Sequence, residues 1–268
     1  MSEITLYGHR GGGDPYPDST VESYSWGANW GADSLEPDLY LTKDGVLVVS
    51  HDNIAGGFAN VTYAEALALN PDLLTFAQVI ELVKQFSIET GRDIGIVPEL
   101  KDQSYAAAEA LVQTLLDADF TDRERVVIQS FGSQNLQWLN DALMPAAGVD
   151  FQLAILTSGI SNLSVVATYA DIIAPSVGSF TAADVQAAHD AGLKVVAWTI
   201  AGSQSAIQSL VDMGVDGVFV DNMELARPGE AAVEGRNVIY GAPQWDVVTD
   251  TAGDDEVYAM RGDDIIRA

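Results

Sequence analysis

Short apolar runs alternate with longer amphipathic stretches along most of the chain. The apolar runs predict about eight strands, which start near Ile4, Ser34, Ile94, Val126, Phe151, Asp171, Lys194 and Gly217. Helical patterns follow nearly every run, in 75–86, 105–118, 161–169 and 204–213 among others, and Thr181 to Asp184 has capping-box spacing. Near-continuous apolar strands that alternate with helices indicate a parallel sheet covered on both faces. We therefore expect an α/β fold of the TIM (β/α)8 barrel type.

The stretch 9–52 has the densest pattern of turns and polar positions. A strand from Ile4 ends in His9-Arg10 and breaks at three glycines, and Ser19 to Glu22 has capping-box spacing before a helix that closes at Gly31. Residues 35–41 read as a second strand. Because a central strand disfavours proline, we expect a strand end or bulge at Pro37. Residues 42–45 form a hairpin turn, and 46–49 run back to His51-Asp52.

Polar side chains gather where the predicted strands end. His9 and Arg10 end the first strand, and Glu36 and Asp38 share one face of the second because strand side chains alternate. The remaining positions of this kind are Glu99 and Lys101 on strand three, Trp198 on strand seven and Asp221 on strand eight. In TIM barrels the C-terminal ends of the strands carry the active site. The stretch 9–52 alone supplies two proton-transfer groups, a fixed cation and two oxygen ligands for a hard metal ion.

Composition narrows the classes of partner. The 268 residues include 12 basic and 39 acidic residues, which give a net charge of −27. This charge argues against binding to nucleic acid or to anionic membranes, and a neutral or zwitterionic small molecule suits it better. The sequence has no cysteine, no apolar run long enough to span a membrane and no N-terminal signal-peptide pattern.

Five motifs in the first part of the chain resemble those of the glycerophosphodiester phosphodiesterase family. They are His9-Arg10-Gly11, Pro17-Asp18-Ser19-Thr20, Glu36-Pro37-Asp38, Thr42-Lys43-Asp44-Gly45 and His51-Asp52, and Glu99-Leu100-Lys101 matches the family's Glu-x-Lys. The second motif differs from the family's Pro-Glu-Asn-Thr. The resemblance covers most of residues 4–222 and implies a TIM barrel that hydrolyses glycerophosphodiesters, such as glycerophosphocholine, to glycerol 3-phosphate and an alcohol.

The same resemblance implies roles for individual residues. Glu36, Asp38 and Glu99 are expected to hold one divalent cation, and all-oxygen ligation suits Ca²⁺ or Mg²⁺. Arg10 and Lys101 are expected to bind the substrate phosphate, and His9 and His51 to act as general acid and base in either order. Trp198 is expected in the substrate pocket, where it either faces a choline head group or serves as a packing residue. Asp221 stands in a motif that departs from the family's.

The C-terminal segment has a different pattern. Glycine, aspartate and aliphatic positions recur nine residues apart, at Gly253 and Gly262, Asp255 and Asp264, and Val257 and Ile266. This resembles two imperfect copies of the calcium-binding RTX nonapeptide, and the alternative is an acidic tail with chance spacing. We therefore expect a barrel over residues 1–240 and an acidic RTX-like tail over 241–268. An RTX tail implies type I secretion and an extracellular location, while a cytoplasmic location stays open.

Two other functions compete with the phosphodiesterase. The first is a phospholipase-D-like enzyme on the same barrel, acting on lysophospholipids or sphingomyelin, whose toxin members usually carry a disulfide that this sequence lacks. The second is a catalytically silent module of a secreted RTX protein. Retention of both histidines and all three carboxylates argues against a silent module.

Overall fold

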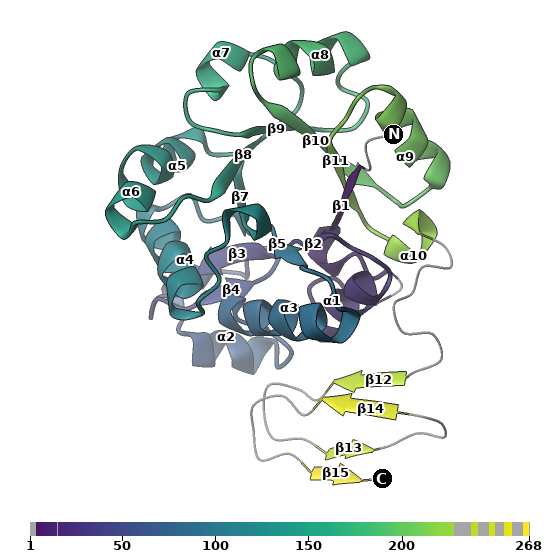
Figure 1. Ribbon diagram of the computed structural model, residues 1–268. Helices are drawn as coiled ribbons and strands as arrows, with labels where there is room; N and C mark the ends of the chain where they lie inside the picture. The colour runs from purple at the N-terminus through teal and green to yellow at the C-terminus, as the bar shows by residue number, and fades with distance from the viewer. Residues whose placement is uncertain are drawn as a thin grey trace.

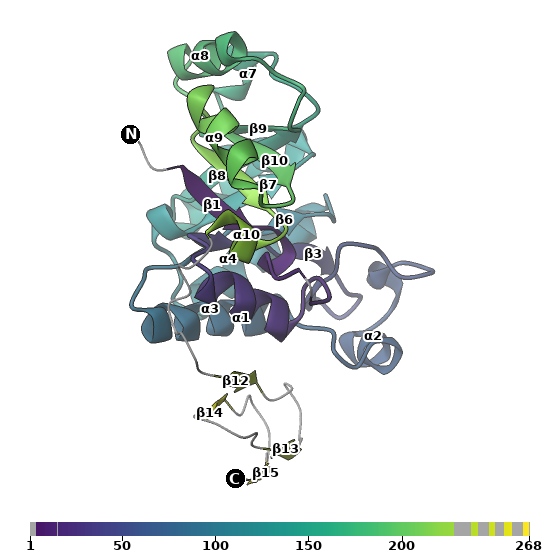
Figure 2. The ribbon, with the colours of Figure 1, turned by 90° about the vertical axis from the view of Figure 1, so that its right-hand side faces the viewer.

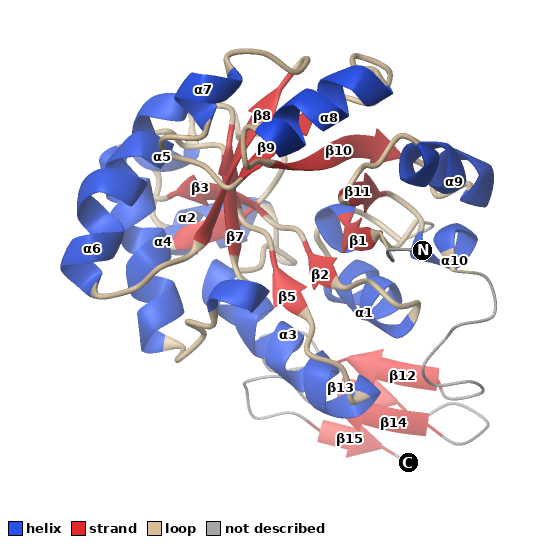
Figure 3. Cartoon of the chain, turned by 45° about the horizontal axis from the view of Figure 1, so that its top comes forward, coloured by secondary structure: helices blue, strands red, loops and turns tan. Residues whose placement is uncertain are grey.

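Parallel strands form a closed ring inside a shell of helices (Figure 1, Figure 3). This computed structural model describes residues 4–14 and 16–227, together with the backbone of four short strands between 237 and 267. The strands of the ring are β1 (Thr5–Gly8), β2 and β3 (Ser34–Leu35 and Asp38–Leu41), β5 and β6 (Gly95–Ile96 and Glu99–Leu100), β7 (Val127–Ser130), β8 (Gln152–Thr157), β9 (Ile172–Pro175), β10 (Lys194–Ile200) and β11 (Gly217–Val220).

Ten of the eleven strands of this sheet fill the eight positions of the ring. Strands β2 and β3 share the second position and β5 and β6 the third, while β4 (Leu47–Val49) is the antiparallel return arm of a hairpin with β3. Every neighbouring pair of positions is parallel, and β11 pairs with β1, which closes the ring. The predicted (β/α)8 barrel is confirmed.

The described part of the chain has ten α-helices, most of which cover the outside of the ring. They are α1 (Val21–Asn29), α2 (Tyr63–Leu69), α3 (Phe76–Thr90), α4 (Tyr105–Asp117), α5 (Ser133–Trp138), α6 (Met144–Ala147), α7 (Leu163–Val166), α8 (Ala182–Asp190), α9 (Gln204–Asp212) and α10 (Met223–Ala226). A π-helical segment, Leu139–Leu143, joins α5 to α6. Figure 2 shows that α2, which follows the hairpin, projects beyond the barrel. Among the described residues, no helix combines the length and the apolar character that crossing a bilayer requires.

Two prolines divide the second and third barrel strands. Pro37 separates β2 from β3, and Pro98 separates β5 from β6, because proline has no backbone N–H for the ladder. Both prolines still accept hydrogen bonds from the next strand, since Glu99 N–H donates to Pro37 O and Gln129 N–H to Pro98 O. The expected break at Pro37 is confirmed, whereas the break at Pro98 was not predicted.

Of the two predicted capping boxes, one is confirmed and one is wrong. Thr181 and Asp184 form a full capping box at α8, as predicted. The predicted capping box of Ser19 and Glu22 is wrong. Thr20 is the N-cap of α1 and accepts a hydrogen bond from Ser23 N, while Ser19 has a left-handed φ of 61°. The helix predicted over 161–169 is limited to α7, and its N-cap Asn162 has a left-handed φ of 53°.

The barrel itself has two apolar layers. Inside the ring, seven buried side chains from seven strand positions pack on one another: Tyr7, Val97, Val127, Ala154, Ile172, Val196 and Phe219. A larger layer fills the space between the ring and the helices, and it includes Leu35, Ile80, Phe86 and Leu111. The alternation of strand side chains explains both layers, since successive residues point into the ring and out to the helices.

Three aspartates brace the N-terminal end of the barrel. Asp33, Asp171 and Asp216 each accept a backbone N–H from a neighbouring strand, those of Leu6, Leu153 and Val195, at 2.7–2.9 Å. Each also pairs with a cationic or imidazole group, from Arg227, Arg123 and His189 respectively, at 2.5–3.1 Å. These acidic residues and His189 therefore stabilise the barrel at the end opposite to the predicted active site.

The four strands beyond residue 227 pair with one another. Strand β12 (Asn237–Tyr240) pairs in parallel with β14 (Asp255–Tyr258), and β13 (Val247–Thr249) with β15 (Ile265–Arg267). Each pair is offset by 18 residues, twice the nine-residue spacing of the sequence motif. Gly253 and Gly262 lie outside the described residues, and the RTX resemblance and the boundary after residue 240 stay predictions. Strand β12 precedes that boundary, yet its partner β14 follows it.

Truncation after Arg227 is expected to leave the melting temperature of the barrel within about 3 °C of that of the full chain. A shift of this size corresponds to about 1 kcal/mol in a barrel of this length. The reason is that the described strand pairs of the tail join tail strands to one another, and Arg227 itself, which bonds Asp33, is retained. Differential scanning calorimetry of both proteins provides the test. Loss of the barrel transition would show that residues beyond 227 belong to the barrel.

Candidate active site

The turn after β1 places His9 and Arg10 at the mouth of the barrel. The chain leaves the strand through one 3₁₀ turn, in which Arg10 has a left-handed φ of 50°. Helix α1 packs tightly on this turn, because a Cβ on Gly27 would lie 1.8 Å from Gly11 O. The backbone N–H of Arg10 donates to Glu36 Oε2 at 2.8 Å. Glycines at 11 and 27 thus permit the close approach that brings the first two strand ends together.

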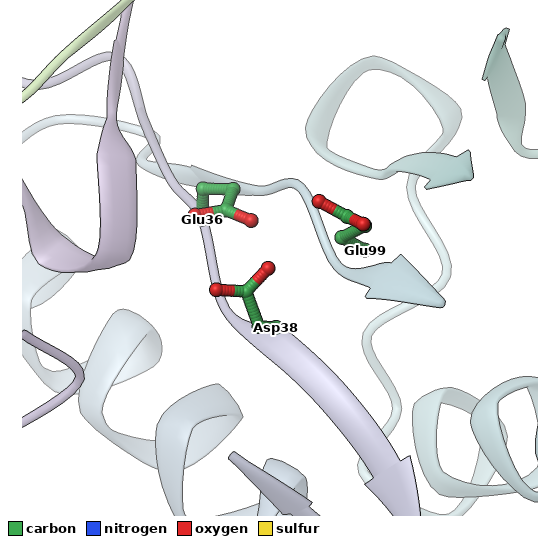
Figure 4. Close-up of side chains that lie close together, drawn as sticks. All are labelled: Glu36, Asp38 and Glu99. Carbon is green, nitrogen blue, oxygen red and sulfur yellow. The ribbon is translucent and has the colours of Figure 1, made fainter. Parts of the chain in front are cut away.

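Three carboxylates meet beside this turn (Figure 4). Glu36 comes from the break between β2 and β3, Asp38 begins β3, and Glu99 begins β6. Asp38 and Glu99 are paired in register on neighbouring strands, and the alternation of side chains keeps Glu36 on the same side. One carboxylate oxygen from each residue lies within 4.8 Å of the other two, and all three residues are buried.

The three carboxylates carry more negative charge than the neighbouring cations offset. Burial, reinforced by Asp38 and Glu99, raises the pKa of Glu36 well above its ordinary value, and burial followed by Asp38 raises the pKa of Glu99 to about 7. Two cations offset part of the repulsion. Arg10 Nε lies 3.2 Å from Asp38 Oδ2, and Lys101 Nζ lies 3.2 Å from Asp38 Oδ1 and 3.0 Å from Glu99 Oε1. Burial lowers the pKa of Lys101, but these carboxylates outweigh burial and raise it.

The cluster fits a hard divalent cation. Asp38 is 1% exposed, and its two oxygens lie 3.2 Å from the cationic groups of Arg10 and Lys101 in a geometry that forms no regular hydrogen bond. Three buried carboxylates carry more negative charge than these two cations offset, which is costly unless a further cation compensates it. Oxygen donors alone suit Ca²⁺ or Mg²⁺ rather than softer metals. Glu36, Asp38 and Glu99, the predicted ligands, would therefore hold such an ion.

Cation binding is expected to strengthen as pH rises through neutrality. The raised pKa values mean that, between about pH 4.5 and the folded pKa of about 7 for Glu99, the native protein binds more protons than the unfolded chain. The contribution of these groups to metal-free stability is therefore present at low pH and is lost as pH rises through about 7. A cation needs the ionised carboxylates, so its binding opposes this loss and releases protons.

The measurement is the increase in melting temperature that a saturating cation produces, at about pH 6 and about pH 8. A larger increase at the higher pH is the expected result. Titration calorimetry at the lower pH, in two buffers of different ionisation enthalpy, gives the number of protons released. Equal stabilisation at both pH values without proton release would contradict the coupling.

Two histidines face the same cleft as the carboxylates, and each has an aspartate at Nδ1. His9 Nδ1 lies 2.6 Å from Asp221 Oδ1, and His51 Nδ1 lies 2.9 Å from Asp52 Oδ1. A carboxylate at Nδ1 holds the proton on that nitrogen in the neutral ring and leaves Nε2 as the reactive atom. The cleft has a volume of about 200 Å³, and His9, Arg10, His51 and Lys101 line it together with Glu36 and Glu99.

The other wall of the cleft is apolar. Phe131, Leu156, Trp198 and Phe219 line it, with Thr199 beside them. The indole N–H of Trp198 donates to Ala174 O at 2.8 Å, which fixes the ring, and Phe131 meets that ring edge to face at 5.6 Å. Phe131 is 49% exposed. The cleft thus presents charged groups to one side of a ligand and aromatic surface to the other.

Every predicted site residue lines this cleft except Asp38, which belongs to the carboxylate cluster beside it. The structure also adds residues that were not predicted. Asp221 directly follows β11, so its place at a C-terminal strand end was the available signal for its contact with His9. Gln129 and Phe131 were missed, although a glutamine within the apolar run of β7 marks a buried polar group. Asp18 stands where the second motif departs from the family's, and it pairs with Arg10 at 2.9 Å.

Comparison with known proteins identifies the relatives of this chain. A model of the glycerophosphoryl diester phosphodiesterase family matches residues 9–225. A glycerophosphodiester phosphodiesterase of Bacillus altitudinis is 29% identical over 242 residues, which cover 81% of this chain and 94% of that protein. One from Caldanaerobacter subterraneus subsp. tengcongensis is 26% identical over 240 residues, covering 81% and 93% of the two chains.

Solved structures share the fold. An Oleispira antarctica phosphodiesterase in complex with the product sn-glycerol-3-phosphate superposes with a TM-score of 0.70 at 21% identity, over 82% of this chain and 94% of that one. A glycerophosphodiester phosphodiesterase of Thermotoga maritima superposes with a TM-score of 0.65 at 21% identity, over 84% and 97%. Identities this low establish similarity of the barrel alone.

Proposed function

The chain belongs to the glycerophosphoryl diester phosphodiesterase family, and on that premise we propose that it uses one divalent cation to hydrolyse glycerophosphodiesters such as glycerophosphocholine. The products are glycerol 3-phosphate and an alcohol. The observation that carries the proposal is the convergence of three buried carboxylates with two histidine–aspartate pairs on one cleft. The bound product of the Oleispira antarctica relative supports the glycerol 3-phosphate assignment.

The charged wall of the cleft binds the phosphodiester. Arg10 and Lys101 line this wall and are held in place by Asp38, so their cationic heads are available to phosphate oxygens. A divalent cation on Glu36, Asp38 and Glu99 would supply further positive charge against the charge that develops on those oxygens. The carboxylates themselves orient Arg10 and Lys101.

Proton transfer falls to the two histidines. One accepts a proton from the oxygen that attacks phosphorus, and the other donates a proton to the alcohol oxygen as its bond to phosphorus breaks. Asp221 and Asp52 keep Nδ1 protonated, which frees Nε2 of each ring for the transfer, and their charges stabilise the imidazolium. The first product reveals whether water or a substrate hydroxyl attacks phosphorus, because attack by a hydroxyl yields a cyclic phosphate first.

Phosphorus NMR of the reaction with glycerophosphocholine provides the test. Glycerol 3-phosphate as the phosphorus-containing product supports the proposal, and a transient cyclic phosphate would identify the attacking group. A reaction that yields phosphocholine instead would assign cleavage to the other ester bond. No turnover of any glycerophosphodiester in the presence of Mg²⁺ or Ca²⁺ would favour the silent module.

The exposed side chain of Phe131 on the apolar wall favours a second candidate, the release of choline from a lysophospholipid. Half-exposed Phe131 offers apolar surface beside the phosphate-binding residues, where an acyl chain gains about 25 cal/mol per Å² of apolar surface that it buries. Comparing kcat/KM for glycerophosphocholine and lysophosphatidylcholine separates the two. A preference of about 10-fold or more for the lysolipid, about 1.4 kcal/mol, would make it the substrate.

Replacement of Asp221 by asparagine is expected to lower kcat on glycerophosphocholine by about 10- to 100-fold. The amide preserves the size of the side chain but removes the charge that stabilises the protonated ring of His9. The expected loss is below the ~10⁴-fold found for a buried aspartate of a serine-protease triad, because Asp221 is 49% exposed. The matched change Asp52→Asn should cost less, since Asp52 is 91% exposed. Unchanged kcat in Asp221→Asn would make the contact incidental.

A further inference from the structure

A row of paired residues crosses three neighbouring strands at the level of the carboxylate cluster. Asp38 on β3 is in register with Glu99 on β6, and Glu99 is in register with Gln129 on β7. The next residue in the same row is Ala154 on β8, followed by Ile172 on β9. Gln129 is therefore the last polar member of the row, where the cation site borders the apolar interior of the barrel.

Burial of the Gln129 side chain carries a free-energy cost, because its amide is polar. Gln129 is 2% exposed, and it lines the catalytic cleft while also packing against the apolar interior of the barrel, beside Val97 and Val127. Its Oε1 has no hydrogen-bond partner among the described residues. A leucine or methionine would fill the same space without a buried polar atom left unpaired, so packing alone does not explain an amide here.

The Nε2 end of the amide has a defined partner. It donates to Glu36 Oε1 at 3.3 Å, while Arg10 N–H donates to the other oxygen of that carboxylate at 2.8 Å. Glu36 is thus held at both oxygens, from β7 on one side and from the turn after β1 on the other. Groups that orient a ligand in this way typically change metal affinity 10- to 100-fold when they are removed.

We propose that Gln129 is a positioning residue for the cation site, and that its N–H donor keeps Glu36 in the orientation that binds the cation. This inference rests on the proposed cation-dependent function. The role requires a donor at the reach of a glutamine, since its backbone is fixed by the bond from Gln129 N–H to Pro98 O. An apolar side chain provides no donor, and asparagine is one methylene shorter.

The test compares Gln129→Met with a matched buried glutamine on the next strand. Gln152 on β8 is 7% exposed, and both ends of its amide are paired: Nε2 donates to Arg123 O, and Lys194 Nζ donates to Oε1. It has no contact with the carboxylate cluster among the described interactions. Gln152→Met therefore removes a buried amide from the same barrel without touching the site.

Two readouts are needed, namely the dissociation constant for Mg²⁺ or Ca²⁺ by titration calorimetry and the melting temperature of the metal-free protein. Gln129→Met should weaken cation binding by about 10-fold or more and leave the metal-free melting temperature unchanged or higher. Gln152→Met should lower that temperature and leave cation affinity unchanged. Gln129→Asn should weaken cation binding as well, and it serves in place of Gln129→Met if that variant does not fold.

The outcomes separate this inference from the proposed function. If the wild-type protein binds neither cation, both the cation site and the role of Gln129 are refuted. If the wild-type protein binds and Gln129→Met binds within about twofold, the role of Gln129 alone is refuted. If Gln152→Met loses affinity to the same extent, the effect belongs to the stability of the barrel and the inference is overturned.

Discussion

Removal of divalent cations is expected to reduce turnover of glycerophosphocholine to background, and addition of Mg²⁺ or Ca²⁺ should restore it. The reason lies in the burial of Glu36, Asp38 and Glu99, whose oxygens lie within 4.8 Å of one another. Without a cation, burial favours the protonated forms of Glu36 and Glu99, and the cleft loses the positive charge that the phosphodiester needs. Dialysis against EDTA, followed by assay with and without added cation, measures this.

Substitutions in the carboxylate cluster test the same dependence on a divalent cation. Glu36→Gln keeps the shape of the side chain and removes a charged ligand, so the cation concentration for half-maximal activity should rise by about 10-fold or more. Asp216→Asn, at the opposite end of the barrel, should leave that concentration unchanged, because Asp216 bonds Val195 N and His189. Full activity after dialysis in excess EDTA would refute cation dependence.

Replacement of either cleft histidine by alanine is expected to lower kcat by about 10²- to 10⁴-fold or more, the usual contribution of a general acid or base. His9 and His51 line the cleft, and each has its Nδ1 beside a carboxylate. The loss should be largest on glycerophosphocholine, whose alcohol is a poor leaving group. On an aryl phosphodiester with a good leaving group, the variant that lacks the general acid should recover most of its activity, which assigns the two roles.

The third histidine provides the control. His189 bonds Asp216 at the N-terminal end of the barrel, so His189→Ala should lower the melting temperature and keep kcat within a few-fold of wild type. The cleft variants should show the reverse pattern, with a melting temperature near that of wild type in the presence of cation. Near wild-type turnover of glycerophosphocholine by His9→Ala or His51→Ala would make that histidine structural.

Much of the fold was predictable because its signals are local. Apolar runs of strand length, helical periodicity between them and the threonine cap of α8 each depend on residues close in sequence. The break at Pro37 was also predictable, since a missing N–H is a property of the residue itself. The N-cap of α1 was assigned one residue too early, because Ser19 and Thr20 are both capable caps. The hydrogen bond that Ser19 N–H donates to Arg10 O decides between them, because it ties Ser19 to the turn after β1.

In the candidate site, too, some features follow from local sequence signals and others only from the tertiary structure. The sequence by itself determined the barrel, the groups at its strand ends and the pair of carboxylates on one strand, because alternation and chain order specify them. Only the tertiary structure decided the contacts that closure of the ring creates. Asp221 reaches His9 across 212 residues, and Gln129 reaches Glu36 across 93. Such contacts depend on strand register and on the packing of α1 against the first turn, which no local pattern encodes.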